Sequence, residues 1–169
     1  LPPDVNESLE DFTVVGNKIR FGLNAVKNLG RNAVTAIIEA RNQKGEFKSF
    51  SDFTEKVNLH EVNKKAIESL IRCGAFDSTG AKRSALLAVL DKVIDMRSRR
   101  QKEKERGQAS FFDLFEDDSE FIESEMDLPD IPEFDDKELL QMEKDLLGLY
   151  VSGHPLKDIS SELEKYCDS

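Results

Sequence analysis

The chain has 169 residues, 38% of them hydrophobic and 34% charged, and its formal net charge is −10 at pH 7. This composition suits one compact domain with appended segments. The sequence contains no run of about eighteen apolar residues, so we expect neither a membrane-spanning helix nor binding to a membrane. Two cysteines and two histidines without CxxC spacing disfavour a metal site or a disulfide framework, so we expect no cofactor. Cysteine usage fits a reducing cytoplasm, and the start at Leu1 without Met or leader indicates a soluble fragment of a larger protein.

The charge is distributed unevenly along the chain. Residues 17–107 hold 20 Lys and Arg against 11 Asp and Glu, a net charge of +9. Residues 108–169 hold 4 against 19, a net charge of −15. The negative total therefore does not exclude nucleic-acid binding by the basic body. The alternative is that these charges only solvate surface helices.

The first forty residues predict a hairpin followed by two short helices. Strand-forming segments at 12–15 and 18–21 flank the Gly16-Asn17 turn, which indicates a short β-hairpin. Apolar spacing between Leu23 and Arg41 then becomes helical, and Gly30 interrupts it. We therefore expect two short helices joined by a tight turn.

Capping residues mark the helices that follow. Ser51 and Asp52 can cap a short helix, and Asn63 can cap a helix over 64–73. A longer helix is expected over 82–106, whose last ten residues carry almost no apolar side chain and should leave the domain as a charged extension.

The C-terminal third is acidic and has two expected parts. Residues 107–136 contain two prolines and isolated apolar residues, a composition that packs poorly and predicts a partly disordered linker. A last amphipathic helix is expected over 135–147.

The first turn is close to the hairpin of a helix-hairpin-helix motif. Leu29 should insert into the core, while Gly30 leaves backbone N–H groups facing outward at the next helix N-terminus, where they can bind a phosphate oxygen. Asn28 replaces a glycine and is among the few residues that tolerate the left-handed region. The alternative is an ordinary glycine helix stop beside lysines. The candidate DNA-binding residues here are Lys27, Asn28, Leu29, Gly30, Arg31 and Asn32.

A second turn, over 74–80, repeats this arrangement and adds Gly80, Lys82 and Arg83 as candidate DNA-binding residues. Cations are unfavourable at a helix N-terminus, so an external anion would explain Lys82 and Arg83 better than local stability does. Two such units predict a mainly α fold: a tandem helix-hairpin-helix domain with a short N-terminal β-hairpin and an acidic, partly disordered C-terminal tail. We expect sequence-independent binding of duplex DNA through backbone contacts.

The acidic tail contains a candidate docking peptide, Gln108-Ala109-Ser110-Phe111-Phe112. Two adjacent phenylalanines in a polar segment are costly exposed surface unless a partner buries them. A polar Gln leading to a hydrophobic pair is the arrangement of peptides that insert into sliding-clamp pockets. The alternative is that both rings fold back onto the domain.

Further segments resemble one family, the alpha subunits of bacterial DNA polymerase III. They are LPPDVNES at 1–8, IRFGL at 19–23, ESLI at 68–71 with GAFD at 74–77, and LGLYVSGHPL at 147–156. Together they are more specific than either functional motif, and the resemblance covers nearly the whole chain.

The resemblance implies that residues 1–22 end the fingers region and that 23–106 form a tandem helix-hairpin-helix domain behind the active site. It places the clamp-binding peptide and acidic linker at 107–134, and a helix leading to a following domain at 135–169. The implied partners are duplex DNA, the beta sliding clamp, and the rest of the polymerase III alpha chain and holoenzyme in the bacterial cytoplasm, at the nucleoid. The implied function is to support processive replication. No catalytic residue is expected here, because the carboxylates that hold Mg²⁺ would lie elsewhere.

Two other functions remain open at this point. A purely structural connector would use the hairpins only to pack helices, and it would not bind DNA. A helix-hairpin-helix nuclease or glycosylase would need a nucleophile, a lysine in an apolar pocket or a carboxylate cluster, and the sequence suggests none of these.

Overall fold

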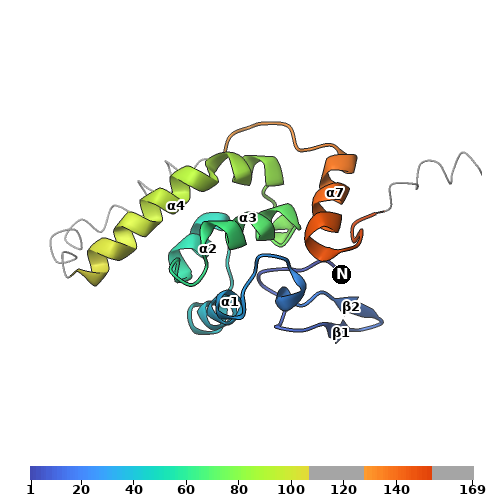
Figure 1. Ribbon diagram of the computed structural model, residues 1–169, viewed down its shortest axis with the longest axis horizontal. Helices are drawn as coiled ribbons and strands as arrows, with labels where there is room; N and C mark the ends of the chain where they lie inside the picture. The colour runs from blue at the N-terminus through green and yellow to red at the C-terminus, as the bar shows by residue number, and fades with distance from the viewer. Residues whose placement is uncertain (107–127, 154–169) are drawn as a thin grey trace, which may run out of the picture.

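The computed structural model describes residues 1–106 and 128–153 (Figure 1). In chain order its elements are β1 (Thr13–Val15), β2 (Lys18–Arg20), the 3-10 turn η1 (Leu23–Ala25), α1 (Arg31–Lys44), α2 (Phe50–Lys56), α3 (Lys64–Arg72), the 3-10 turn η2 (Asp77–Thr79), α4 (Arg83–Glu105) and α7 (Asp136–Leu147). The predicted fold class, mainly α with a short N-terminal β-hairpin, is confirmed. Within the described ranges, no helix is both long and apolar enough to cross a membrane.

The N-terminal hairpin forms where the sequence predicts it. β1 and β2 are antiparallel, with Val14 opposite Ile19. The turn between them needs a positive φ, which Gly16 adopts at 63° without steric cost. The residues of this segment are therefore sufficient to predict the hairpin that the structure contains.

The prediction of a short helix before Gly30 is wrong. Leu23–Ala25 form a single 3-10 turn, and the chain is extended again at Val26. The apolar residues Leu23, Val26 and Leu29 are spaced by three, which matches the three residues per turn of a 3-10 helix better than the 3.6 of an α-helix. All three are buried, so the pattern did identify core residues.

Helix α2 is also present, but its predicted cap is wrong. Ser49 is the N-cap, and its hydroxyl accepts from the backbone N–H of Asp52 at 3.1 Å. Starting the helix earlier places Phe50 within it, where its ring is 4% exposed. Burial of this ring favours the earlier start over a cap at Ser51.

The cap predicted for α3 is confirmed, and the structure adds a cap at the predicted helix α7. Asn63 accepts from the N–H of Ala66 at 2.9 Å. Asp135 and Glu138 form a reciprocal capping box at the start of α7. Each of these signals lies within four residues of the helix that it starts, which is why the sequence alone reveals it.

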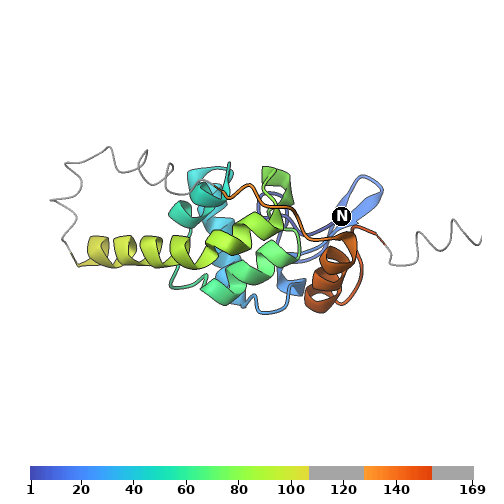
Figure 2. The same ribbon diagram turned by 90° about the horizontal axis from the view of Figure 1, so that it is seen from above.

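Helix α4 is the long helix of the fold, and it extends beyond the other helices (Figure 2). Leu86, Leu90 and Val93 are buried along its first half. Arg97 is its last buried residue, and it donates to the hydroxyl of Ser51 at 3.1 Å. One turn further on, Gln101 still donates to the carbonyl of Val57 at 3.1 Å, so the charged extension predicted from residue 97 begins later than the sequence suggests.

The core joins α2 to the loop after α3 through aromatic rings. Phe53 and Phe76 meet edge to face with centroids 4.9 Å apart, and Phe47 and Phe50 pack around them. All four rings are buried. Such edge-on contacts add to the free energy gained from burial itself.

Residues 128–153 lie against this body. The segment before α7 crosses the N-terminal end of α4, and α7 lies beside α3 (Figures 1 and 2). The carbonyl of Leu146 accepts from the N–H of Lys27 at 3.0 Å, so the end of α7 contacts the first turn directly.

Candidate nucleic-acid interface

The first turn has the backbone geometry that the sequence predicts. Asn28 adopts φ 65°, the one positive φ among the described non-glycine residues. Its side-chain amide donates to the hydroxyl of Ser69 at 3.1 Å, which ties the turn to α3. Leu29 is 8% exposed and belongs to the core. Asn28 and Leu29 thus attach the turn to the body of the protein through one polar and one apolar contact.

The N-terminus of α1, which follows this turn, is open. Gly30 is the N-cap in an extended conformation, and no side chain caps the helix. In the described part of the chain, nothing accepts from the N–H groups of Arg31, Asn32 or Ala33. A Cβ added at Gly30 would meet no protein atom within 4 Å. These donors and the positive end of the helix dipole therefore face open space, where they can bind an anion.

The charges around this terminus also favour an anion. Lys27 and Arg31 are exposed, and neither forms an ion pair with any residue in 1–106 or 128–153. The first turn of α1 contains no acidic residue. The structure thus brings all six predicted residues of the first turn together, five of them at the surface and Leu29 beneath.

The second turn also has the predicted backbone but a different side-chain arrangement. Gly74 and Gly80 have φ of 87° and 82°. A Cβ at Gly74 would clash with the guanidinium of Arg83, so glycine is required for Arg83 to pack across the loop.

Arg83 is not an exposed cation, contrary to our expectation from the sequence. It is 5% exposed and forms a two-bond ion pair with Asp77, at 3.1 and 2.7 Å. It also donates to the carbonyl of Arg72 at 3.0 Å and to Glu143 at 3.1 Å. Burial and pairing remove Arg83 from the candidate DNA surface of this structure.

The N-terminus of α4 is closed by an internal anion. The carboxylate of Glu133 accepts from the N–H groups of Arg83 at 2.7 Å and Ser84 at 3.0 Å. Burial alone would raise the pKa of Glu133, but the backbone donors of Ser84, Phe134 and Arg83 outweigh it and lower the pKa below its ordinary value. The anion that we inferred at this terminus is therefore a side chain of the same protein.

Lys82 lies beside this closed terminus. Its amine donates to the carbonyl of Ile131 at 3.2 Å and is 4.0 Å from Asp130. The side chain keeps 49% of its exposure, and Gly80 is exposed as well. A role for Gly80 and Lys82 in DNA binding stays a prediction.

Glu143 is the second residue of this network that sequence reasoning missed. It is fully buried and accepts from Arg83, from the N–H groups of Val151 and Ser152 at 3.1 and 3.0 Å, and from the Ser152 hydroxyl at 2.8 Å. Burial would raise its pKa, but the donors from Ser152 and Arg83 lower it below its ordinary value. A signal was present, because Glu143 lies between Leu139 and Leu146 on the apolar stripe of α7.

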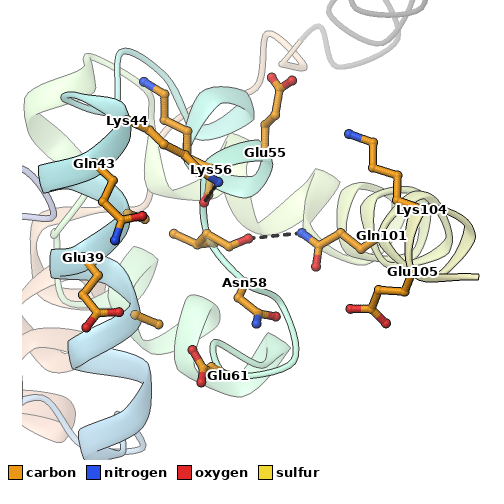
Figure 3. Close-up of a pocket in the computed structure, with 13 residues that line it drawn as sticks. Glu39, Gln43, Lys44, Glu55, Lys56, Asn58, Glu61, Gln101, Lys104 and Glu105 are labelled. Carbon is orange, nitrogen blue, oxygen red and sulfur yellow. Dashed lines mark hydrogen bonds between the residues drawn. The ribbon is translucent and has the colours of Figure 1, made fainter. Parts of the chain in front are cut away.

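A cleft of about 460 Å³ lies at the far end of α1, between α1, α2 and the last turns of α4 (Figure 3). Gln101 lines the cleft from α4 and donates to the carbonyl of Val57 at 3.1 Å. Its charged lining residues are Glu39, Glu55, Glu61, Glu105, Lys44, Lys56 and Lys104. Lys44 already donates to the carbonyl of Lys56 at 2.9 Å, and acids outnumber bases. This cleft is a poorer site for a phosphate than the N-terminus of α1.

Comparison with known proteins agrees with the two-turn geometry. The family model described as "Helix-hairpin-helix motif" matches residues 1–86, which include both turns. The chain belongs to the helix-hairpin-helix family.

The helix-hairpin-helix chain is also similar over its whole length to alpha subunits of DNA polymerase III. It is 44% identical to the subunit of Mycobacterium leprae over 171 residues and 40% identical to that of Vibrio cholerae over 167 residues, which are 100% and 98% of this chain. The subunit of Thermus aquaticus is 43% identical over 159 residues, or 92% of this chain. The chain spans 14% of the first two relatives and 12% of the third.

The predicted clamp-binding residues of this helix-hairpin-helix protein, Gln108 to Phe112, lie outside the described residues. Their role stays a prediction. In the described ranges, no group of three or more His, Cys, Asp or Glu side chains is placed to hold a metal ion.

Proposed function

We propose that this chain is the part of a replicative DNA polymerase that holds duplex DNA by its sugar-phosphate backbone. The observation that carries this proposal is the N-terminus of α1, which no described side chain caps, beside the cations Lys27 and Arg31, which form no ion pair within residues 1–106 and 128–153. Backbone N–H groups and cations contact phosphates without reading bases, so binding would be independent of sequence. Similarity to polymerase alpha subunits supports the same role.

Duplex titration of the 169-residue chain tests this proposal. In about 50 mM salt, a Lys27→Ala/Arg31→Ala variant should bind a fluorescent duplex more weakly by on the order of tenfold or more, because two phosphate contacts are lost. Lys48→Ala is the matched control, because Lys48 is exposed beyond the opposite end of α1. Equal affinities for the two variants would refute the assignment of the first turn.

Clamp docking is the second part of the proposed function. We place it in Gln108 to Phe112 because two adjacent aromatic side chains in an acidic segment gain most by inserting into a partner's pockets. A ring clamp around DNA would make each rebinding of the duplex intramolecular, so weak backbone contacts would give long residence and processive synthesis.

Pull-down with a bacterial ring clamp tests the peptide. Phe111→Ala/Phe112→Ala should abolish clamp binding, whereas Phe121→Ala, in the same acidic segment but outside the peptide, should not change it. Retention of binding by the double variant would refute the docking proposal and leave DNA holding by the first turn intact.

We also propose that the catalytic carboxylates of the polymerase lie outside this chain. Asp77, Glu133 and Glu143 are each occupied by donors of the protein itself. These bonds give the three carboxylates roles in packing and capping.

A structural connector is the competing function, and one observation favours it for the second turn. Glu133 fills the helix N-terminus where a DNA phosphate would otherwise bind. If the first turn were also only structural, then the wild-type chain would show no duplex binding at low salt. Measurable binding that is lost on replacing Lys27 and Arg31 excludes the connector.

A further inference from the structure

Residues 128–134 cross the N-terminal end of α4 (Figures 1 and 2), and we call this segment the strap. In the part of the chain that the structure describes, each hydrogen bond from the strap to the body goes to Lys82, Arg83 or Ser84. Two of these bonds end on backbone carbonyls of the strap. The other two place the Glu133 carboxylate on the N–H groups of Arg83 and Ser84. The strap is therefore attached at one place, the start of α4.

The strap adds no side chain to the hydrophobic core. Leu128 is 40% exposed, and Ile131 and Phe134 neither belong to the core nor pack against it. Helix α7, which follows the strap, is anchored separately by Leu146, a buried member of the core, and by the fully buried Glu143. Segments without buried apolar contacts lie at the low end of local stability. The strap can therefore leave α4 while α7 and the core stay packed.

Beneath the strap, α4 begins with the same backbone features as α1. The N-caps Lys82 and Gly30 are both extended, with φ of −72° and −74°, and neither caps its helix with its own side chain. Neither helix has an acidic residue in its first turn. The difference is Glu133, whose two carboxylate oxygens accept from the N–H groups as the oxygens of a phosphate would. The donors keep the pKa of Glu133 below its ordinary value, so the carboxyl is ionised at neutral pH.

We propose that Glu133 is an autoinhibitory contact, an internal substitute for a DNA phosphate that limits this chain to the phosphate contacts of the first turn. This inference rests on the proposed function, the holding of duplex DNA. A carboxylate of the same chain competes at high effective concentration, so a phosphate of the duplex meets a terminus that is already filled. Without this carboxylate, the N–H groups of Arg83 and Ser84 and the exposed amine of Lys82 form a second place for a phosphate.

Titration of the 169-residue chain with a fluorescent duplex, at a series of salt concentrations, tests this proposal. At about 50 mM salt, Glu133→Ala should bind at least about threefold more tightly than wild type, and its slope of log Kobs against log salt should be steeper by about 1. Glu133→Ala/Lys82→Ala should lose the added slope, because the amine is part of the exposed site. Asp136→Ala is the matched control, since it removes the same charge from an exposed side chain close by in sequence and should leave the slope unchanged.

Glu133→Gln protects the test against a folding defect. Its amide keeps an oxygen acceptor for the N–H groups of α4 but carries no charge, so a phosphate should displace it more readily than the carboxylate. This variant should therefore also bind the duplex more tightly than wild type. The proposal is overturned if neither Glu133 variant binds more tightly than wild type, or if Asp136→Ala gains as much.

Amide NMR signals during the same titration separate this inference from the proposed function. When the duplex is added, the signals of Arg83 and Ser84 should shift in Glu133→Ala and stay in place in wild type. The signals of Arg31 and Asn32, at the open terminus of α1, should shift in both proteins. Shifts at Arg31 and Asn32 without shifts at Arg83 and Ser84 in the variant would overturn the inference and leave the proposed function intact. The absence of shifts at all four amides in both proteins would overturn both.

Discussion

The two glycine-containing turns of this protein lead into helix N-termini that differ in their hydrogen bonding: the terminus of α1 is open, and that of α4 is capped by Glu133. At α1, the first N–H groups after Gly30 have no acceptor among the described residues, and the neighbouring cations face solvent. At α4, Glu133 accepts from the first N–H groups, and Arg83 is buried beneath them. The same local pattern can therefore serve ligand binding in one place and packing in the other.

The difference comes from a distant segment and not from the turns themselves. Arg83 and Glu133 are 50 residues apart, and Glu143 lies in α7, the helix that follows Glu133. Within residues 1–106 and 128–153, no carboxylate takes the place of Glu133 at α1, where the end of α7 contributes the Leu146 carbonyl to the N–H of Lys27. A turn motif alone thus cannot tell whether its helix terminus is free.

Loss of Glu143 should have the largest effect on the closed turn. Glu143→Ala leaves Arg83 and the N–H groups of Val151 and Ser152 without their buried acceptor. We expect the free energy of unfolding to fall by about 3–5 kcal/mol, measured by urea denaturation. Asp145→Ala, on the exposed side of the same helix, should change it by about 0.5 kcal/mol or less. Equal small effects would contradict the buried network.

Removal of Glu133 should open the second turn at a smaller cost. Glu133→Ala deprives the N–H groups of Arg83 and Ser84 of their acceptor. The expected loss is about 1–2 kcal/mol, as for other helix caps. Thermal unfolding measures this loss, with Asp130→Ala as the control. Asp130 is exposed, and its one ion pair in the described residues, with Lys82, is long at 4.0 Å. An equal change in both variants would mean that Glu133 does not cap α4.

The first turn should be sensitive to backbone conformation. Asn28→Ala places a less tolerant residue at φ 65°, so we expect a loss of about 1 kcal/mol in the free energy of unfolding. Asn28→Gly, which suits this φ, should lose less even though both variants lack the hydrogen bond to Ser69. If Gly were as destabilising as Ala, then the hydrogen bond and not the φ angle would determine the cost.

Acid should weaken the closed turn through Glu133. Its pKa in the folded protein lies below the ordinary value of 4.5, so its contribution to stability is present above pH 4.5 and is lost as pH falls toward the folded pKa. Glu133→Gln removes this titration. We expect urea denaturation at a series of pH values to show a shallower loss of stability below pH 4.5 in the variant than in wild type. Parallel curves would refute the pKa shift.

Much of the fold follows from local sequence, and the exceptions have identifiable physical causes. The hairpin, the Asn63 cap and the left-handed Asn28 depend on neighbouring residues, so the sequence predicts them. The 3-10 turn at Leu23–Ala25 was missed because spacing by three fits both helix types over so few residues. The closure of α4 could not be predicted, because Glu133 lies in a segment whose composition suggested only a linker.

The salt dependence of duplex binding tests most directly the claim that the first turn, and not the second, holds phosphate. The slope of log Kobs against log salt should become shallower by about 1 in Arg31→Ala, because one phosphate contact is lost. In Lys82→Ala it should change by less than half as much, since that amine already lies against the Ile131 carbonyl. An unchanged slope in Arg31→Ala, or equal changes in both variants, would contradict the distinction between an open and a closed turn.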